Sequence, residues 1–136
     1  MTFAALEETL RCYLDGSCDT SIPTIAMIKK PVEVLDVAAK KLKNLLKNID
    51  GVSSAVMREK SQVGGGSVPG VFIDTRAVQV EVKGISAAAL EEKLRKEYSI
   101  ICRIIKDKIV FDVRTLLDGD DKKIAEALRK ICEEIA

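Results

Sequence analysis

Apolar side chains recur at helical spacing in several stretches of the chain, and each stretch predicts an amphipathic helix. These stretches cover residues 3–14, 31–49, 86–98 and 118–135. Pro31 suits a first helical turn, and Ser86 and Asp118 can cap a helix by accepting bonds from backbone N–H groups. The segment 18–30 is expected to be irregular, because Pro23 disfavours helix at the residue before it.

Alternation with a period of two predicts the strands. Val78, Val80 and Val82 alternate with polar residues, which is typical of a half-buried strand. The other expected strands cover residues 52–60, 100–105 and 109–113. The resulting order of elements predicts an α+β fold, in which a four-stranded, mostly antiparallel sheet carries helices on one face. Residues 1–30 are covered less well by this arrangement and are expected to pack on something outside the chain.

Composition bounds the class of protein. The 136 residues allow one compact domain, and 47% hydrophobic with 32% charged residues is typical of a folded chain. A net charge of +1 is too small for the chain to attract nucleic acid or anionic lipid through its overall charge. The chain has no apolar run long enough to span a bilayer and no signal-peptide pattern at its N-terminus, so we expect a cytoplasmic protein without a membrane segment.

Catalytic residues are scarce. Histidine is absent, and Cys12, Cys18, Cys102 and Cys132 contain no Cys-x-x-Cys pair, so we expect reduced thiols and no metal site. No serine or cysteine stands with a base in a recognisable motif, and the carboxylates fall mostly on predicted helix surfaces. The chain alone is not expected to contain a complete catalytic constellation.

The run Ser61-Gln-Val-Gly-Gly-Gly-Ser-Val-Pro-Gly70 cannot build a regular element. It lacks the Gly-Lys-Ser/Thr of a phosphate loop and the spacing of a dinucleotide fingerprint. Residue types alone leave two interpretations open, a plain turn between strands or a loop that faces a ligand.

Arg103 interrupts the apolar run 100–105, where a strand face should be buried. An arginine there must be paired, face solvent, or face an anion, and strand alternation makes the outward position the ordinary one. Asp112 and Arg114, two residues apart, are expected to form a structural ion pair or to fix the hairpin.

Several segments together resemble a known family. Besides the run 61–70 they are Leu6-Glu-Glu-Thr-Leu10, Ile22-Pro-Thr-Ile-Ala-Met-Ile28, Ile101-Cys-Arg-Ile104 and Phe111-Asp-Val-Arg-Thr-Leu116. In this order, and over nearly the whole chain, they resemble bacterial selenocysteine synthase, the L-seryl-tRNA(Sec) selenium transferase.

The resemblance implies a part of a pyridoxal-phosphate enzyme of the aspartate-aminotransferase fold type (fold type I). Residues 1–30 would be the end of the large domain and a linker, and residues 31–136 the small C-terminal domain. No lysine here matches the motif of the cofactor's Schiff-base lysine, so the cofactor would be bound mainly by the large domain and the fragment alone would be inactive. The full-length enzyme would convert seryl-tRNA(Sec) with selenophosphate and form a homo-oligomer built from dimers.

The resemblance also implies the site residues. Arg103 would bind a substrate carboxylate or another anionic group. The loop residues would approach the mouth of the active site, and they are Gln62, Gly64, Gly65, Gly66 and Ser67. Cys102 stands where the family has glycine, and Lys106-Asp107 replaces its usual Asp-Gly. Two alternatives stay open: a related pyridoxal-phosphate lyase acting on a small amino acid, and a stand-alone interaction or ligand-sensing module.

Overall fold

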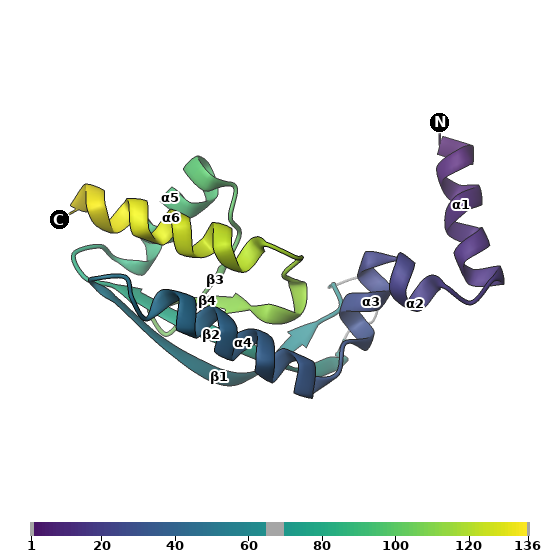
Figure 1. Cartoon of the computed structure of the whole chain (residues 1–136), viewed down its shortest axis with the longest axis horizontal. Helices are drawn as coiled ribbons and strands as arrows, with labels where there is room; N and C mark the ends of the chain where they lie inside the picture. The colour runs from purple at the N-terminus through teal and green to yellow at the C-terminus, as the bar shows by residue number, and fades with distance from the viewer. Residues whose placement is uncertain (1, 65–69, 136) are drawn as a thin grey trace. The chain divides into compact units, whose positions relative to one another are not determined.

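The computed structural model describes residues 2–64 and 70–135. The chain divides into two compact units, Met1–Pro31 and Val32–Ala136. Figure 1 shows helices in the first unit and a sheet with helices in the second.

The smaller unit consists of α1 (Thr2–Leu14), α2 (Cys18–Ser21) and α3 (Pro23–Lys29). The prediction of an irregular segment over 18–30 was wrong. Ile22 is extended, as the residue before a proline prefers, but Pro23 then begins α3, where its missing N–H costs nothing. Lys29 Nζ lies 2.6 Å from Asp19 Oδ2 and joins α3 to α2.

The predicted first helix is confirmed, but its apolar face is open. None of the residues of α1 is buried. Phe3 is 87% exposed and Leu14 is 88% exposed. An amphipathic helix gains most of its stability by burying its apolar stripe, so α1 lacks that contribution within its own unit.

The larger unit is built on an antiparallel sheet, as predicted. Its strands are β1 (Val52–Gln62), β2 (Phe72–Val82), β3 (Arg103–Ile105) and β4 (Lys108–Asp112), in the order β1-β2-β4-β3. β1 and β2 pair in register from Val52 opposite Val82 to Gln62 opposite Phe72. β3 is shorter than the expected strand over 100–105, and the N–H of Ile100 donates to the Leu94 carbonyl at the end of α5 at 3.0 Å.

A two-residue turn joins β3 and β4 in a hairpin. Arg103 pairs with Val110, and Ile105 pairs with Lys108. The two turn residues, Lys106 and Asp107, have φ angles of 51° and 59°. Positive φ at both positions is the geometry of a two-residue turn that matches the twist of the strands.

Helices α4 (Val32–Leu46), α5 (Ala87–Tyr98) and α6 (Asp120–Ile135) cover one face of the sheet (Figure 1). The core between the layers is aliphatic, with Leu42, Leu94 and Leu128 among its fully buried side chains. Ser86 caps α5 as expected, accepting a 3.3 Å bond from the backbone N–H of Ala89. The expected cap at Asp118 was wrong: α6 begins at Asp120, whose Oδ2 accepts the N–H of Leu117 at 2.9 Å.

The opposite face of the sheet has a polar corner. Directly paired residues share a face, and residues two apart on one strand share it as well. Ala77 pairs with Asp112, and Arg103 pairs with Val110, which places these side chains on the face opposite the valines of the core. The same register brings Ser61 and Thr75 to this face.

Candidate functional site

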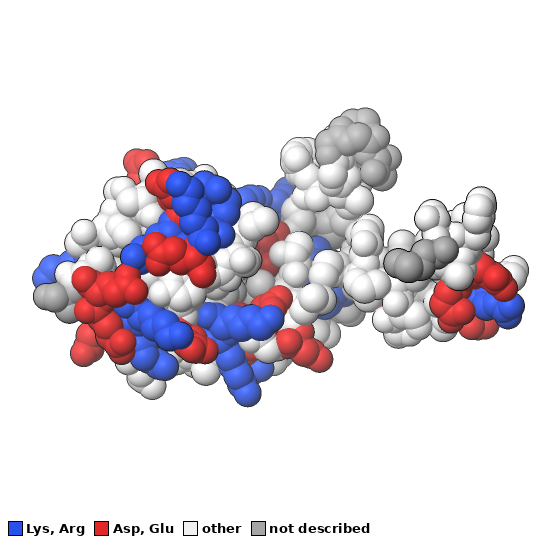
Figure 2. All heavy atoms as spheres, turned by 90° about the horizontal axis from the view of Figure 1, so that it is seen from above, with Lys and Arg blue, Asp and Glu red and all other residues white. Residues whose placement is uncertain are grey.

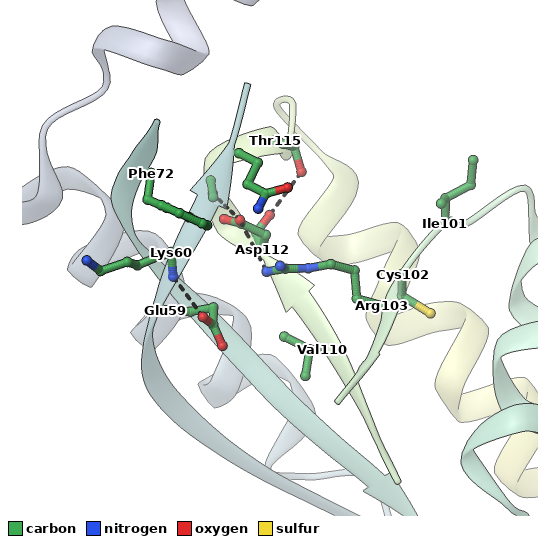
Figure 3. A pocket seen from close by; sticks show the side chains of 11 residues that line it. Glu59, Lys60, Phe72, Ile101, Cys102, Arg103, Val110, Asp112 and Thr115 are labelled. Atoms are coloured by element: carbon green, nitrogen blue, oxygen red, sulfur yellow. Dashed lines mark hydrogen bonds and ion pairs between the residues drawn. The ribbon is translucent and has the colours of Figure 1, made fainter. Parts of the chain in front are cut away.

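A cleft of about 810 Å³ lies over this polar corner. Its lining comes from β1, β2, β3, β4 and the short helix that follows β4. The residues that carry charge are Glu59, Lys60, Arg103 and Asp112. Figure 3 shows the Arg103 side chain extending from β3 towards Asp112.

Asp112 is the centre of the polar contacts. Its Oδ1 accepts a 2.7 Å bond from Thr75 Oγ1 and a 3.0 Å bond from the backbone N–H of Arg114. Its Oδ2 accepts a bond from the Ser61 hydroxyl. The Asp112 side chain is 12% exposed, so these bonds replace most of the water that an ionised carboxylate would otherwise bind.

Arg103 is both paired and accessible. Its Nη2 lies 3.5 Å from Asp112 Oδ2, and its side chain is 44% exposed. A charge-assisted bond is ordinarily about 2.7–2.9 Å long, so this contact orients the guanidinium without fully engaging it. The sequence allowed Arg103 to be paired, to face solvent or to face an anion. In the structure it is paired with Asp112 and also faces solvent.

The loop residues of the predicted site are only partly described. Gln62 ends β1 and lines the cleft with Arg103. Gly64 has a φ of +51°, in the region that favours glycine. Gly65, Gly66 and Ser67 lie outside the described residues.

Cys102 lines the cleft but is not a nucleophile. Burial, with a smaller contribution from Glu91, raises the pKa of its thiol to about 11. The thiol is therefore protonated near neutral pH, and in Figure 3 its sulfur points away from the Arg103 guanidinium. Within residues 2–64 and 70–135, no three histidine, cysteine or carboxylate side chains gather as metal ligands.

The expected partnership of Asp112 and Arg114 has a different form. The backbone N–H of Arg114 donates to Asp112, while Arg114 Nη2 donates to the carbonyl of Asp74 at 2.6 Å. The pair does fix the end of the hairpin, because Asp112 caps the short helix Val113–Thr115 that follows β4 by accepting the Arg114 N–H.

Sequence reasoning missed the contribution of Ser61 and Thr75. Ser61 was considered only as part of the glycine run, and Thr75 precedes the alternating segment that predicted β2. The signal that could have found them is the register of the long β1–β2 hairpin. That register places both hydroxyls on the face of Asp112.

The sheet order, the helices on one face and the cleft on the other define a small α+β domain. Comparison with known proteins identifies the family. The sequence model of the L-seryl-tRNA selenium transferase family matches residues 1–117, and the chain belongs to this family.

Curated relatives agree with this assignment. The chain is 42% identical over 133 residues to the L-seryl-tRNA(Sec) selenium transferase of Aliarcobacter butzleri (strain RM4018). It is 41% identical over 134 residues to that of Clostridium botulinum (strain Hall) and 35% identical over 132 residues to that of Aquifex aeolicus (strain VF5). These alignments cover 96–98% of the chain but only 29% of each relative.

Proposed function

We propose that this chain is the C-terminal part of a pyridoxal-phosphate-dependent L-seryl-tRNA(Sec) selenium transferase. The full-length enzyme would convert seryl-tRNA(Sec) to selenocysteinyl-tRNA(Sec) with selenophosphate. The observation that carries the proposal is that 96–98% of this chain matches 29% of the length of each transferase of that name. In this proposal residues 1–30 end the large domain and residues 31–136 form the small domain.

Pyridoxal phosphate, when bound, supplies an electron sink that labilises bonds at the α-carbon of an amino acid. Its covalent attachment needs a lysine that can lose its proton, which favours a desolvated position. Among the described residues, the buried polar side chains are Ser61, Thr75, Arg114 and Asp121, and none is a lysine. We therefore assign the attachment site to the large domain.

Arg103 is the proposed ligand contact of this chain. Its planar guanidinium suits the paired oxygens of a carboxylate or phosphate, and it lies in the cleft with 44% of its side chain exposed. In seryl-tRNA the serine carboxyl is esterified and carries no charge. The anion that Arg103 meets in a transferase would therefore be a phosphate group, of selenophosphate or of the tRNA terminus. A lyase acting on a free amino acid would present a carboxylate to the same arginine.

The loop beside Arg103 completes the proposed site. Gln62 lines the cleft, and Gly64 leads from β1 into the glycine run. Glycines let backbone N–H groups approach an anion closely, which is the role proposed for Gly64, Gly65, Gly66 and Ser67.

The charge distribution of this chain favours tRNA binding by another part of the enzyme. The net charge is +1, and nucleic-acid surfaces ordinarily carry clustered lysine and arginine. On the face seen in Figure 2, basic and acidic side chains are intermixed over the larger unit. We assign the main contacts to tRNA to the remaining part of the transferase.

The large domain is the proposed partner of α1, whose exposed Phe3 and Leu14 would be covered by it. A homo-oligomer built from dimers, which the family resemblance implies, and a cytoplasmic location, which the sequence pattern favours, complete the proposal. No helix in the described part of the chain has the length and apolar character needed to cross a bilayer.

A chimera tests the proposal. This chain replaces the matching residues of the Aliarcobacter butzleri transferase, with which it shares 42% identity. The proposal expects the chimera to form selenocysteinyl-tRNA(Sec) from seryl-tRNA(Sec) and selenophosphate. A chimera that folds, binds the cofactor and instead eliminates from free amino acids would favour the lyase alternative.

A further inference from the structure

The contacts of Asp112 come from every strand of the sheet. Ser61 belongs to β1, Thr75 to β2 and Arg103 to β3, while Asp112 itself ends β4. Thr75 is fully buried, and Ser61 is 8% exposed. A carboxylate held from so many elements at a mostly buried position has little freedom to rotate.

The two carboxylate oxygens have different tasks. Oδ1 accepts the Thr75 hydroxyl and the backbone N–H of Arg114, both of which are fixed by the fold. Oδ2 accepts the Ser61 hydroxyl and faces Nη2 of Arg103 at 3.5 Å. The first oxygen anchors the carboxylate, and the second directs its charge towards the cleft.

We propose that Asp112, clamped by Ser61, Thr75 and the Arg114 backbone, is a positioning residue that holds the Arg103 guanidinium in place to meet an anion. The inference rests on the proposed function, which makes Arg103 the anion contact. A long, half-exposed arginine loses much rotamer freedom when a ligand fixes it. A fixed counter-charge removes part of that loss before the ligand arrives.

The length of the contact fits this role. At 3.5 Å the Asp112–Arg103 pair uses one terminal nitrogen and uses it weakly. The guanidinium keeps its other nitrogens for a ligand that lies in the cleft, and a phosphate can take two of them side by side.

Replacing Asp112 itself would change the charge of the cleft as well as the orientation of Arg103. Thr75→Val avoids this, because it removes one anchoring bond while keeping the shape of the side chain and the net charge. Thr75→Ser restores the hydroxyl and should restore the wild-type behaviour. Ser61→Ala is a second variant that leaves the net charge unchanged. Ile131→Val, on the buried face of α6, is the control for a loss of stability alone.

The experiment uses the ¹⁵N-labelled chain and the Nε–Hε signals of its arginines. The heteronuclear Overhauser effect of Arg103 reports its order, with exposed Arg129 as an internal reference. Titration with inorganic phosphate gives a Kd from the shift of the Arg103 signal. Thr75→Val is expected to lower the heteronuclear Overhauser effect of Arg103 towards that of Arg129. It should also raise the phosphate Kd about fivefold, which corresponds to the loss of roughly one hydrogen bond. Ile131→Val should change neither value.

Unchanged order of Arg103 in both Thr75→Val and Ser61→Ala would overturn the positioning role. If phosphate leaves the Arg103 signal of the wild-type chain unmoved, the proposed anion contact fails instead. The comparison of order among the variants still decides whether Asp112 positions Arg103, so the two failures are distinguishable.

Discussion

Removing the Asp112 carboxylate should lower the free energy of unfolding of the larger unit. The bonds to Oδ1 and the bonds to Oδ2 should each account for part of this loss. In Asp112→Ala the buried Thr75 hydroxyl and the Arg114 N–H lose their acceptor, and Ser61 and Arg103 lose theirs. Each bond to an ionised group contributes roughly 1.5–3 kcal/mol, and relief of the buried charge offsets part of the sum. We expect a loss of about 3 kcal/mol in the free energy of unfolding.

Asp112→Asn should fall between Ala and wild type. One amide oxygen can still accept the bonds from Thr75 and Arg114, which both reach Oδ1, whereas the amide nitrogen faces the Arg103 donors and can only donate to the Ser61 hydroxyl. We expect a loss of about 1–2 kcal/mol. Urea unfolding followed by circular dichroism measures both values, since the chain has no tryptophan.

Asp74→Ala is the matched control. Asp74 is exposed on the same strand as Thr75, and its side chain does not line the cleft. It should change the free energy of unfolding by less than about 0.5 kcal/mol. If Asp112→Ala cost no more than this control, or less than Asp112→Asn, the reasoning about the two oxygens would be refuted.

Other predictions concern the remaining parts of the chain. The hydrogen bond from the Lys41 ammonium lowers the pKa of Asp121 below its ordinary value of 3.8, so this pair stabilises the fold above that pH and is lost as the pH falls through the lowered pKa. Asp121→Asn should therefore cost on the order of 1 kcal/mol at neutral pH, and this cost should shrink as the pH falls below 3.8, as unfolding curves at a series of pH values will show. Asp107→Gly should raise the free energy of unfolding by about 0.5 kcal/mol, because Asp107 has a φ of 59° and glycine adopts it without strain; a lower melting temperature would speak against this. The chain incubated with pyridoxal phosphate and borohydride should gain no specifically labelled lysine by peptide mass analysis, and a single modified lysine would contradict the proposed division between domains.

Local patterns were sufficient to predict most of the fold. The alternation around Val80 predicted β2, and Ser86 predicted the start of α5, because each signal acts over a few residues. Pro23 shows the limit of such signals. Proline disfavours helix before itself and favours a helical start at its own position, so the same residue predicts both a break and a beginning.

The candidate site was predicted less completely, for a physical reason. Arg103 could be singled out because an arginine in an apolar strand run needs an explanation. Ser61 and Thr75 are ordinary residues until the registers of the β1–β2 and β2–β4 strand pairs place them beside Asp112. Contacts between residues 37 and 51 positions apart depend on that register, which no local pattern of the sequence contains.

We propose above that Arg103 meets a substrate anion in the full-length transferase. Arg103→Ala in the chimeric transferase tests this, with Arg129→Ala on α6 as the matched control. We expect kcat/KM to fall about 10- to 100-fold, because one bond to a charged group is lost, with the melting temperature unchanged. Arg103→Lys should recover only part of the activity, because it keeps the charge and loses the planar fork. Activity equal to that of Arg129→Ala, or a loss of folding that matches the loss of activity, would show that Arg103 does not bind the substrate.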